Sequence, residues 1–104
     1  MTAEKFRGLA LSIPGVSESA HMRHPDFRLE GRIFATLGYR DEQHGMVKLT
    51  SQPQEKFVKM APEVFCSCAG ALGHRGATAV RLAPARAGLI HAALEEARRN
   101  AIGK

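Results

Sequence analysis

The sequence predicts an α+β domain of two layers, in which helices cover one face of an antiparallel sheet. Helical periodicity near both ends and in one middle segment, with short alternating runs between them, supports this fold class. No repeat or long linker divides residues 1–104, so we expect one domain. The predicted order is a helix, three or four strands, a helix, one or two strands and a last helix. A four-stranded ferredoxin-like sheet is the alternative.

The first helix is predicted to begin after Thr2, whose side chain suits an N-cap. Apolar residues recur at helical spacing from Phe6 to Ile13, and Pro14 followed by Gly15 ends the helix. Short apolar and β-branched runs broken by polar turns follow and indicate an antiparallel meander. Its expected strands are Ser19–Met22, Phe27–Leu29, Arg32–Leu37 and Met46–Thr50.

The second half is predicted to hold two further helices and one or two strands. Ser51 and Gln54 have the spacing of a capping box, so a helix should run to about Met60. A short helical turn is expected over residues 62–65, and residues 66–76 are expected to be irregular or partly extended.

The last strand and the last helix have clearer patterns. Ala77–Leu82 alternates as a strand. Pro84 suits the first position of a final helix, in which an apolar stripe runs from Leu89 to Ala101 and which ends near Gly103.

Composition and charge favour a folded cytoplasmic protein with an anionic partner. Apolar residues make up 44% and charged residues 24% of the chain, as in globular proteins. Glu4 and a short, interrupted apolar stretch argue against a signal peptide, and no apolar run approaches the roughly 20 residues that a membrane span requires. The formal net charge of +5 favours polyanions without selecting one.

Strand alternation predicts which side chains share each face of the sheet. One parity is apolar and should meet the helices: Phe27, Leu29, Ile33, Ala35, Leu37, Val47, Leu49, Val80 and Leu82. The other parity, which should form an open face, holds Arg28, Arg32, Phe34, Thr36, Met46, Lys48, Ala79 and Arg81.

The open face is therefore predicted to be cationic with one aromatic ring, a combination that suits phosphates and stacked bases. The candidate DNA-binding residues are Arg28, Arg32, Phe34, Lys48, Arg75 and Arg81. Arg75 belongs to the segment Gly73–Gly76, which is either a loop whose amides meet a phosphate or a structural turn. The alternative for the strand cations is that they keep the sheet soluble and block aggregation at its edge.

No pattern in the sequence indicates catalysis, a metal or a cofactor. Cys66 and Cys68 are separated by one residue, which fits neither a redox pair nor a structural zinc site, and they are expected to be reduced. His21 and His24 should point to opposite faces of an extended chain. No nucleophile lies in a pattern with a base, so we expect a protein that is not an enzyme, with no catalytic, metal or cofactor residues.

Six short motifs occur in order along the chain: Pro14-Gly15, His24–Leu29, Gly31–Leu37, Val47–Leu49, Gly73–Gly76 and Leu94–Ala97. Together they resemble the MmcQ/YjbR-like family, from the first helix through the last. The resemblance implies a two-layer fold similar to secretion chaperones and related to the frataxin-like architecture. It also implies that the open sheet is a double-wing DNA-binding surface.

The chain departs from the pattern of this family in one respect. It has no tryptophan, and Leu72 and Ala77 stand where related sequences often carry aromatic residues, which argues against base stacking near the glycine segment. A frataxin-like iron role is disfavoured because the first helix offers only Glu4.

Two further hypotheses stay open. The domain is then either a protein-interaction module that uses Phe34 and Met46, with a partner unknown, or a sensor of a small anion. We expect a monomer or a weak homodimer.

Overall fold

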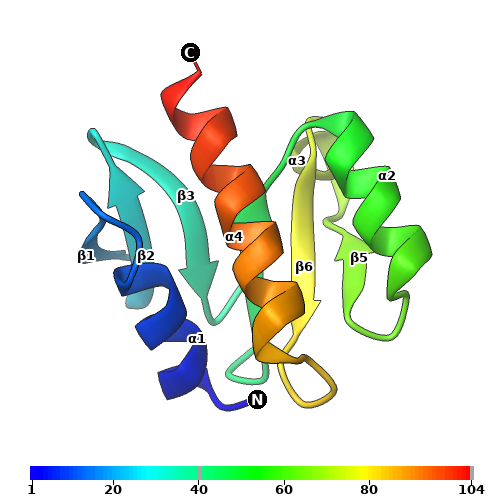
Figure 1. Cartoon of the computed structure of the whole chain (residues 1–104), viewed down its shortest axis with the longest axis horizontal. Coiled ribbons are helices and arrows are strands. Elements are labelled where there is room, and N and C mark those ends of the chain that lie inside the picture. Colours follow the sequence, from blue (N-terminus) through cyan, green and yellow to red (C-terminus); the bar gives the residue numbers. More distant parts are fainter. Residues whose placement is uncertain (40, 104) are drawn as a thin grey trace.

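A computed structural model describes the protein over residues 1–39 and 41–103. In this part of the chain an antiparallel sheet is covered on one face by α1, α2 and α4 (Figure 1). The elements are α1 (Ala3–Leu11), β1 (Ser17–His21), β2 (His24–Leu29), β3 (Arg32–Leu37), β4 (His44–Lys48), α2 (Ser51–Met60), β5 (Phe65–Ser67), α3 (Gly70–His74), β6 (Ala77–Arg81) and α4 (Ala87–Ile102).

The described strands form one sheet in the order β1-β2-β3-β4-β6-β5, and all neighbours are antiparallel. The first four follow one another as a meander, as the sequence predicts. After α2 the chain forms β5 at the far edge and returns as β6 between β4 and β5. The predicted two-layer α+β class is confirmed, and the four-stranded ferredoxin-like alternative is wrong.

The first helix begins as predicted. The Thr2 side chain accepts a hydrogen bond from the Lys5 amide at 3.1 Å, which satisfies one of the unpaired donors at the helix start. The first hairpin is tighter than predicted, and the second turns at Glu30 and Gly31 as predicted. Met22 and Arg23 alone join β1 to β2, with φ of 49° and 67°, and Glu30 and Gly31 join β2 to β3, with φ of 54° and 79°. Such turns match the twist of paired strands, so β1 and β2 pair up to the turn.

The predicted capping box at the start of α2 does not form. Thr50 occupies the N-cap without a side-chain hydrogen bond. Gln54 instead donates from Nε2 to the carbonyls of Gly73 and Ala77, both at 3.0 Å. The amide therefore links α2 to α3 and β6, and a tertiary contact replaces the local one.

The segment after α2 has more regular structure than predicted. Residues 65–67 form β5 instead of ending a helical turn, and residues 70–74 form α3 instead of irregular chain. The last helix begins at Ala87 and not at Pro84, because the Ala85 amide donates to the Leu82 carbonyl in a turn that contains Pro84. Among the described residues no helix is long and apolar enough to cross a membrane.

Apolar side chains form two clusters on opposite faces of the sheet. The larger lies between the sheet and the helices and includes aromatic contacts between Phe6 and Phe27 and between Phe57 and Phe65. The smaller lies on the open face, defined here as the face opposite α4, and consists of Met46, Cys68, Ala77 and Ala79 with Tyr39 packed against them. The open face is therefore partly apolar.

Candidate functional site

A β-bulge in β3 decides which side chains share the open face. Phe27 pairs with Ala35, whereas the next residue, Arg28, pairs with Ile33. Phe34 is thus an extra residue on β3 that has no partner on β2. Phe34 and Ala35 are both fully buried in the core cluster, so two consecutive residues face the helices.

This bulge overturns three of the predicted face assignments. Phe34 has 0% of its surface exposed and cannot offer a ring to a ligand on the open face. Arg32 reaches the helix side, where its Nη1 donates to the carbonyl of Ala101 near the end of α4 at 3.2 Å. Ile33, predicted for the helix face, lines a hollow on the open face. Strict alternation holds for Thr36, which lies on the open face as predicted.

Of the other predicted cations, Lys48 and Arg81 lie on the sheet and Arg75 lies at the end of α3. Lys48 pairs with Ala77 and Arg81 pairs with His44, so Lys48 and Arg81 lie at opposite ends of the β4–β6 pair. Arg81 is exposed, and Arg75 is exposed at the C-terminal cap of α3.

Arg28 is held by the buried carboxylate of Asp26. The Asp26 side chain is 0% exposed and accepts from Arg28 Nε at 2.8 Å and from Arg28 Nη2 at 3.1 Å. His21 Nδ1 lies 2.8 Å from the second Asp26 oxygen. The hydrogen bond from Arg28 is the main cause that lowers the pKa of Asp26; the His21 contact also lowers it, and burial opposes both. Asp26 therefore compensates part of the Arg28 charge.

His21 and His24 lie on the same face, contrary to the prediction. They face each other across the β1–β2 hairpin and both line the same hollow. Spacing along an extended chain misled the prediction, because the turn at Met22 and Arg23 reverses the chain between them. That turn lacks the asparagine or glycine by which such hairpins are usually found in a sequence.

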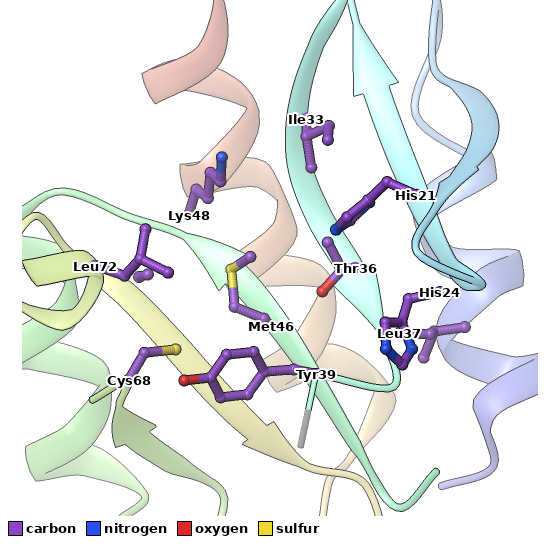
Figure 2. Close-up of a pocket in the computed structure, with 11 residues that line it drawn as sticks. His21, His24, Ile33, Thr36, Leu37, Tyr39, Met46, Lys48, Cys68 and Leu72 are labelled. Carbon is purple, nitrogen blue, oxygen red and sulfur yellow. The ribbon is translucent and has the colours of Figure 1, made fainter. Parts of the chain in front are cut away.

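A hollow of about 260 Å³ lies on the open face, and we call it the central hollow. Met46 and Thr36 lie in its middle, and Figure 2 shows the ring of Tyr39 along one side with its hydroxyl end toward Cys68. His21 and His24 line it from the hairpin side, and Leu72 lines it from α3 on the other side. Sequence analysis missed Tyr39 because it lies in a polar turn after β3.

Two further hollows adjoin the central hollow at Lys48. One, of about 370 Å³, is lined by Arg28, Arg32 and Lys48, and we call it the arginine hollow. The other, of about 200 Å³, is lined by Lys48 and Arg75, and we call it the Arg75 hollow. Asn100 lines both and donates from Nδ2 to the Lys48 carbonyl at 3.2 Å, so the end of α4 supports this part of β4. Lys48 therefore lines all three hollows.

The segment Gly73–Gly76 is a structural turn. The Arg75 amide donates to the carbonyls of Ala71 and Leu72, and the Gly76 amide donates to the carbonyl of Gly73. Gly76 has a φ of +110°, and a Cβ atom there would lie 2.0 Å from the Leu49 carbonyl oxygen. These two amides complete the end of α3, so the phosphate-loop alternative is wrong for them, and only the Arg75 side chain remains a candidate.

The cysteines lie in different environments. Cys66 is exposed on β5, Cys68 is buried beside the central hollow, and no disulfide joins them. Over residues 1–39 and 41–103 no group of three or more histidine, cysteine or acidic side chains is placed to hold a metal ion.

The fold and these hollows define a class: a two-layer α/β domain with an open antiparallel sheet whose uncovered face carries a partly cationic depression. A solved structure has the same fold. The crystal structure of Deinococcus radiodurans protein DR2400, with a DUF419 domain, superimposes with a TM-score of 0.80 over 99% of this chain and 80% of that chain, at 15% sequence identity. At this identity the similarity shows the fold alone. No protein-family model matches the sequence, and no curated protein matches it.

Proposed function

We propose that the protein is a non-enzymatic module that binds DNA at the end of its sheet where Lys48 lies. One observation carries the proposal: Lys48 lines three adjoining hollows, and Arg28, Arg32 and Arg75 line two of them with it. Cations around hollows that share a lining residue form a surface to which successive phosphates can bind electrostatically. The net charge of +5 supports the same partner.

The set of binding residues differs from the one that alternation predicts. Phe34 leaves the set because it is buried. Arg32 remains in the set because it lines the arginine hollow, although its side chain lies on the helix side of the strand. Arg28 contributes less than a full charge because Asp26 pairs with it. Lys48 and Arg75 are the cations on which the proposal chiefly depends.

We further infer that the chain belongs to the MmcQ/YjbR-like family, to which DUF419 domains are related. The motifs occur in the family's order along nearly the whole chain. The fold shared with DR2400 supports this assignment.

The double variant Lys48→Gln/Arg75→Gln tests the proposal. Loss of two phosphate contacts should weaken binding of a fluorescent single-stranded oligonucleotide by at least about tenfold at low salt. The slope of log K against log salt should also become shallower by about 1.5, at roughly 0.7 to 0.9 per contact. Fluorescence anisotropy over a salt series measures both quantities.

The matched control is Lys5→Gln/Lys59→Gln, which removes the same charge from exposed positions on α1 and α2. It should change affinity little, with a salt slope like that of the unmodified protein. Equal losses in both double variants would show that net charge acts without a site. Absence of binding by the unmodified protein at low salt would contradict DNA binding and favour the protein-interaction alternative, for which Met46 lines the central hollow while Phe34 is buried.

A further inference from the structure

The central hollow has the size of a site for one flat ring. Its volume of about 260 Å³ lies below the roughly 300 Å³ at which pockets for whole drug-sized molecules begin. Its lining is mainly apolar, with Ile33, Met46 and Leu72 contributing aliphatic surface. A planar heterocycle is an occupant of suitable size, whereas a whole cofactor is too large.

Aromatic side chains border the same hollow. Figure 2 shows the Tyr39 ring along one side, with the imidazole rings of His21 and His24 on the side of the hairpin. Stacking on such rings accepts any base, because every base has a π-face. Tyr39 therefore takes the stacking role that the sequence assigned to Phe34.

Charge complementarity selects a nucleotide over an uncharged ring. Lys48 borders the central hollow, and the arginine and Arg75 hollows adjoin it there. A base in the central hollow would have its own phosphate and the next one near these cations. A duplex cannot enter in this way, because its bases are paired and stacked inside the helix.

We propose that the central hollow receives one unstacked base of a single strand, so that the protein binds single-stranded nucleic acid in preference to duplex. The inference rests on the proposed function, since the phosphates are held by the cations assigned there. Tyr39 and Met46 contact the base, and Lys48 contacts the backbone beside it.

The test compares three labelled DNA probes of equal length with the unmodified protein. They are a thymidine oligomer, an oligomer in which tetrahydrofuran residues replace all the nucleosides, and a duplex. The thymidine oligomer should bind about tenfold or more tightly than the abasic oligomer, because one base-stacking contact is lost. The affinity for the duplex should not exceed the affinity for the abasic oligomer when both are measured at the same salt concentration.

Tyr39→Ala should abolish the difference between the thymidine and abasic oligomers, and Tyr39→Phe should keep it. Circular dichroism shows whether each variant is folded. If Tyr39→Ala does not fold, the comparison of probes on the unmodified protein still tests the proposal. Equal, salt-sensitive binding of all three probes would overturn the base site and leave DNA binding intact. Binding of none would overturn both, and would leave the hollow as a site for an apolar side chain of a protein partner.

Discussion

Asp26 is a buried carboxylate on the open face of the sheet, and its partners Arg28 and His21 each line one of the hollows. It accepts hydrogen bonds from Arg28 and has His21 within 2.8 Å. A buried charge is tolerated only when such partners compensate it. The carboxylate therefore fixes the position of Arg28 at the arginine hollow while it reduces the net charge there.

Asp26→Asn should lower the melting temperature by several degrees at neutral pH, because the amide loses the charge-assisted contacts with Arg28 and His21. The folded-state pKa of Asp26 is depressed below its unfolded value of about 3.9, so the stabilisation is complete above that pH. It is lost as the pH falls from about 4 through the folded-state pKa. Thermal unfolding of both proteins over a pH series measures the difference.

The exposed residue Glu63 offers a control for this experiment, as Glu63→Gln should leave the melting temperature nearly unchanged. A constant difference between Asp26→Asn and the unmodified protein down to pH 2 would show that the ion pair does not stabilise the fold.

At the scale of residues, the sequence predicted some of the side chains that line the hollows and missed others. Lys48 was identified from charge and strand alternation and Arg75 from its glycine segment, and both line the Arg75 hollow. Tyr39 and the two hairpin histidines were not identified, because their proximity depends on two turns that the sequence does not specify clearly.

Among the elements, the β1–β2 hairpin carries backbone strain. Met22 and Arg23 both have positive φ, which costs non-glycine residues free energy. Met22 is also 85% exposed, and its neighbour His21 lines the central hollow. This conformation is maintained by the pairing of the strands and not by the preferences of the turn residues.

Replacing the turn by Met22→Asn/Arg23→Gly should stabilise the fold by about 1 kcal/mol, because these residues adopt the left-handed conformation readily. Urea unfolding should show a higher midpoint with an unchanged slope. Met22→Ala alone removes the exposed side chain but keeps the strained turn, and it should give no gain. A gain of equal size in both variants would attribute the effect to loss of the exposed methionine.

Helix and strand positions were predictable where periodicity was long, as for α1, β3 and α4. The short elements β5 and α3 were not, because three and five residues carry too little pattern, and their positions depend on contacts such as those of Gln54 with Gly73 and Ala77. The bulge at Phe34 was also invisible, since both Ile33 and Phe34 suit a buried position.

In the molecule as a whole, the two layers separate the main hydrophobic core from the open face. The helices cover one face and bury the large aromatic side chains, while Lys48, Arg75 and Asn100 line a hollow at one end of the sheet. The layer arrangement was predictable from the order of elements. The concentration of cations at one end was not, because it depends on strand register and on the position of α3.

This asymmetry predicts that Arg81→Gln affects DNA binding less than Lys48→Gln. Four residues separate the register positions of the two side chains, or roughly 13 Å along the strand, which exceeds the screening length of about 10 Å at 0.1 M salt. Anisotropy at that ionic strength should show a loss of about twofold or less for Arg81→Gln and about fivefold for Lys48→Gln. Equal losses would indicate that the ligand runs along the whole of β6.

The bulge at Phe34 shifts the alternation of inward and outward side chains by one residue for the rest of β3. Residues before it in β3 follow one phase, with Arg32 inward and Ile33 outward, and residues after it follow the other. At identities as low as 15%, an alignment without a gap at this point would equate a buried position with one on the open face wherever a relative lacks the bulge. Comparison of binding residues among such proteins therefore has to begin from strand pairing and not from residue count.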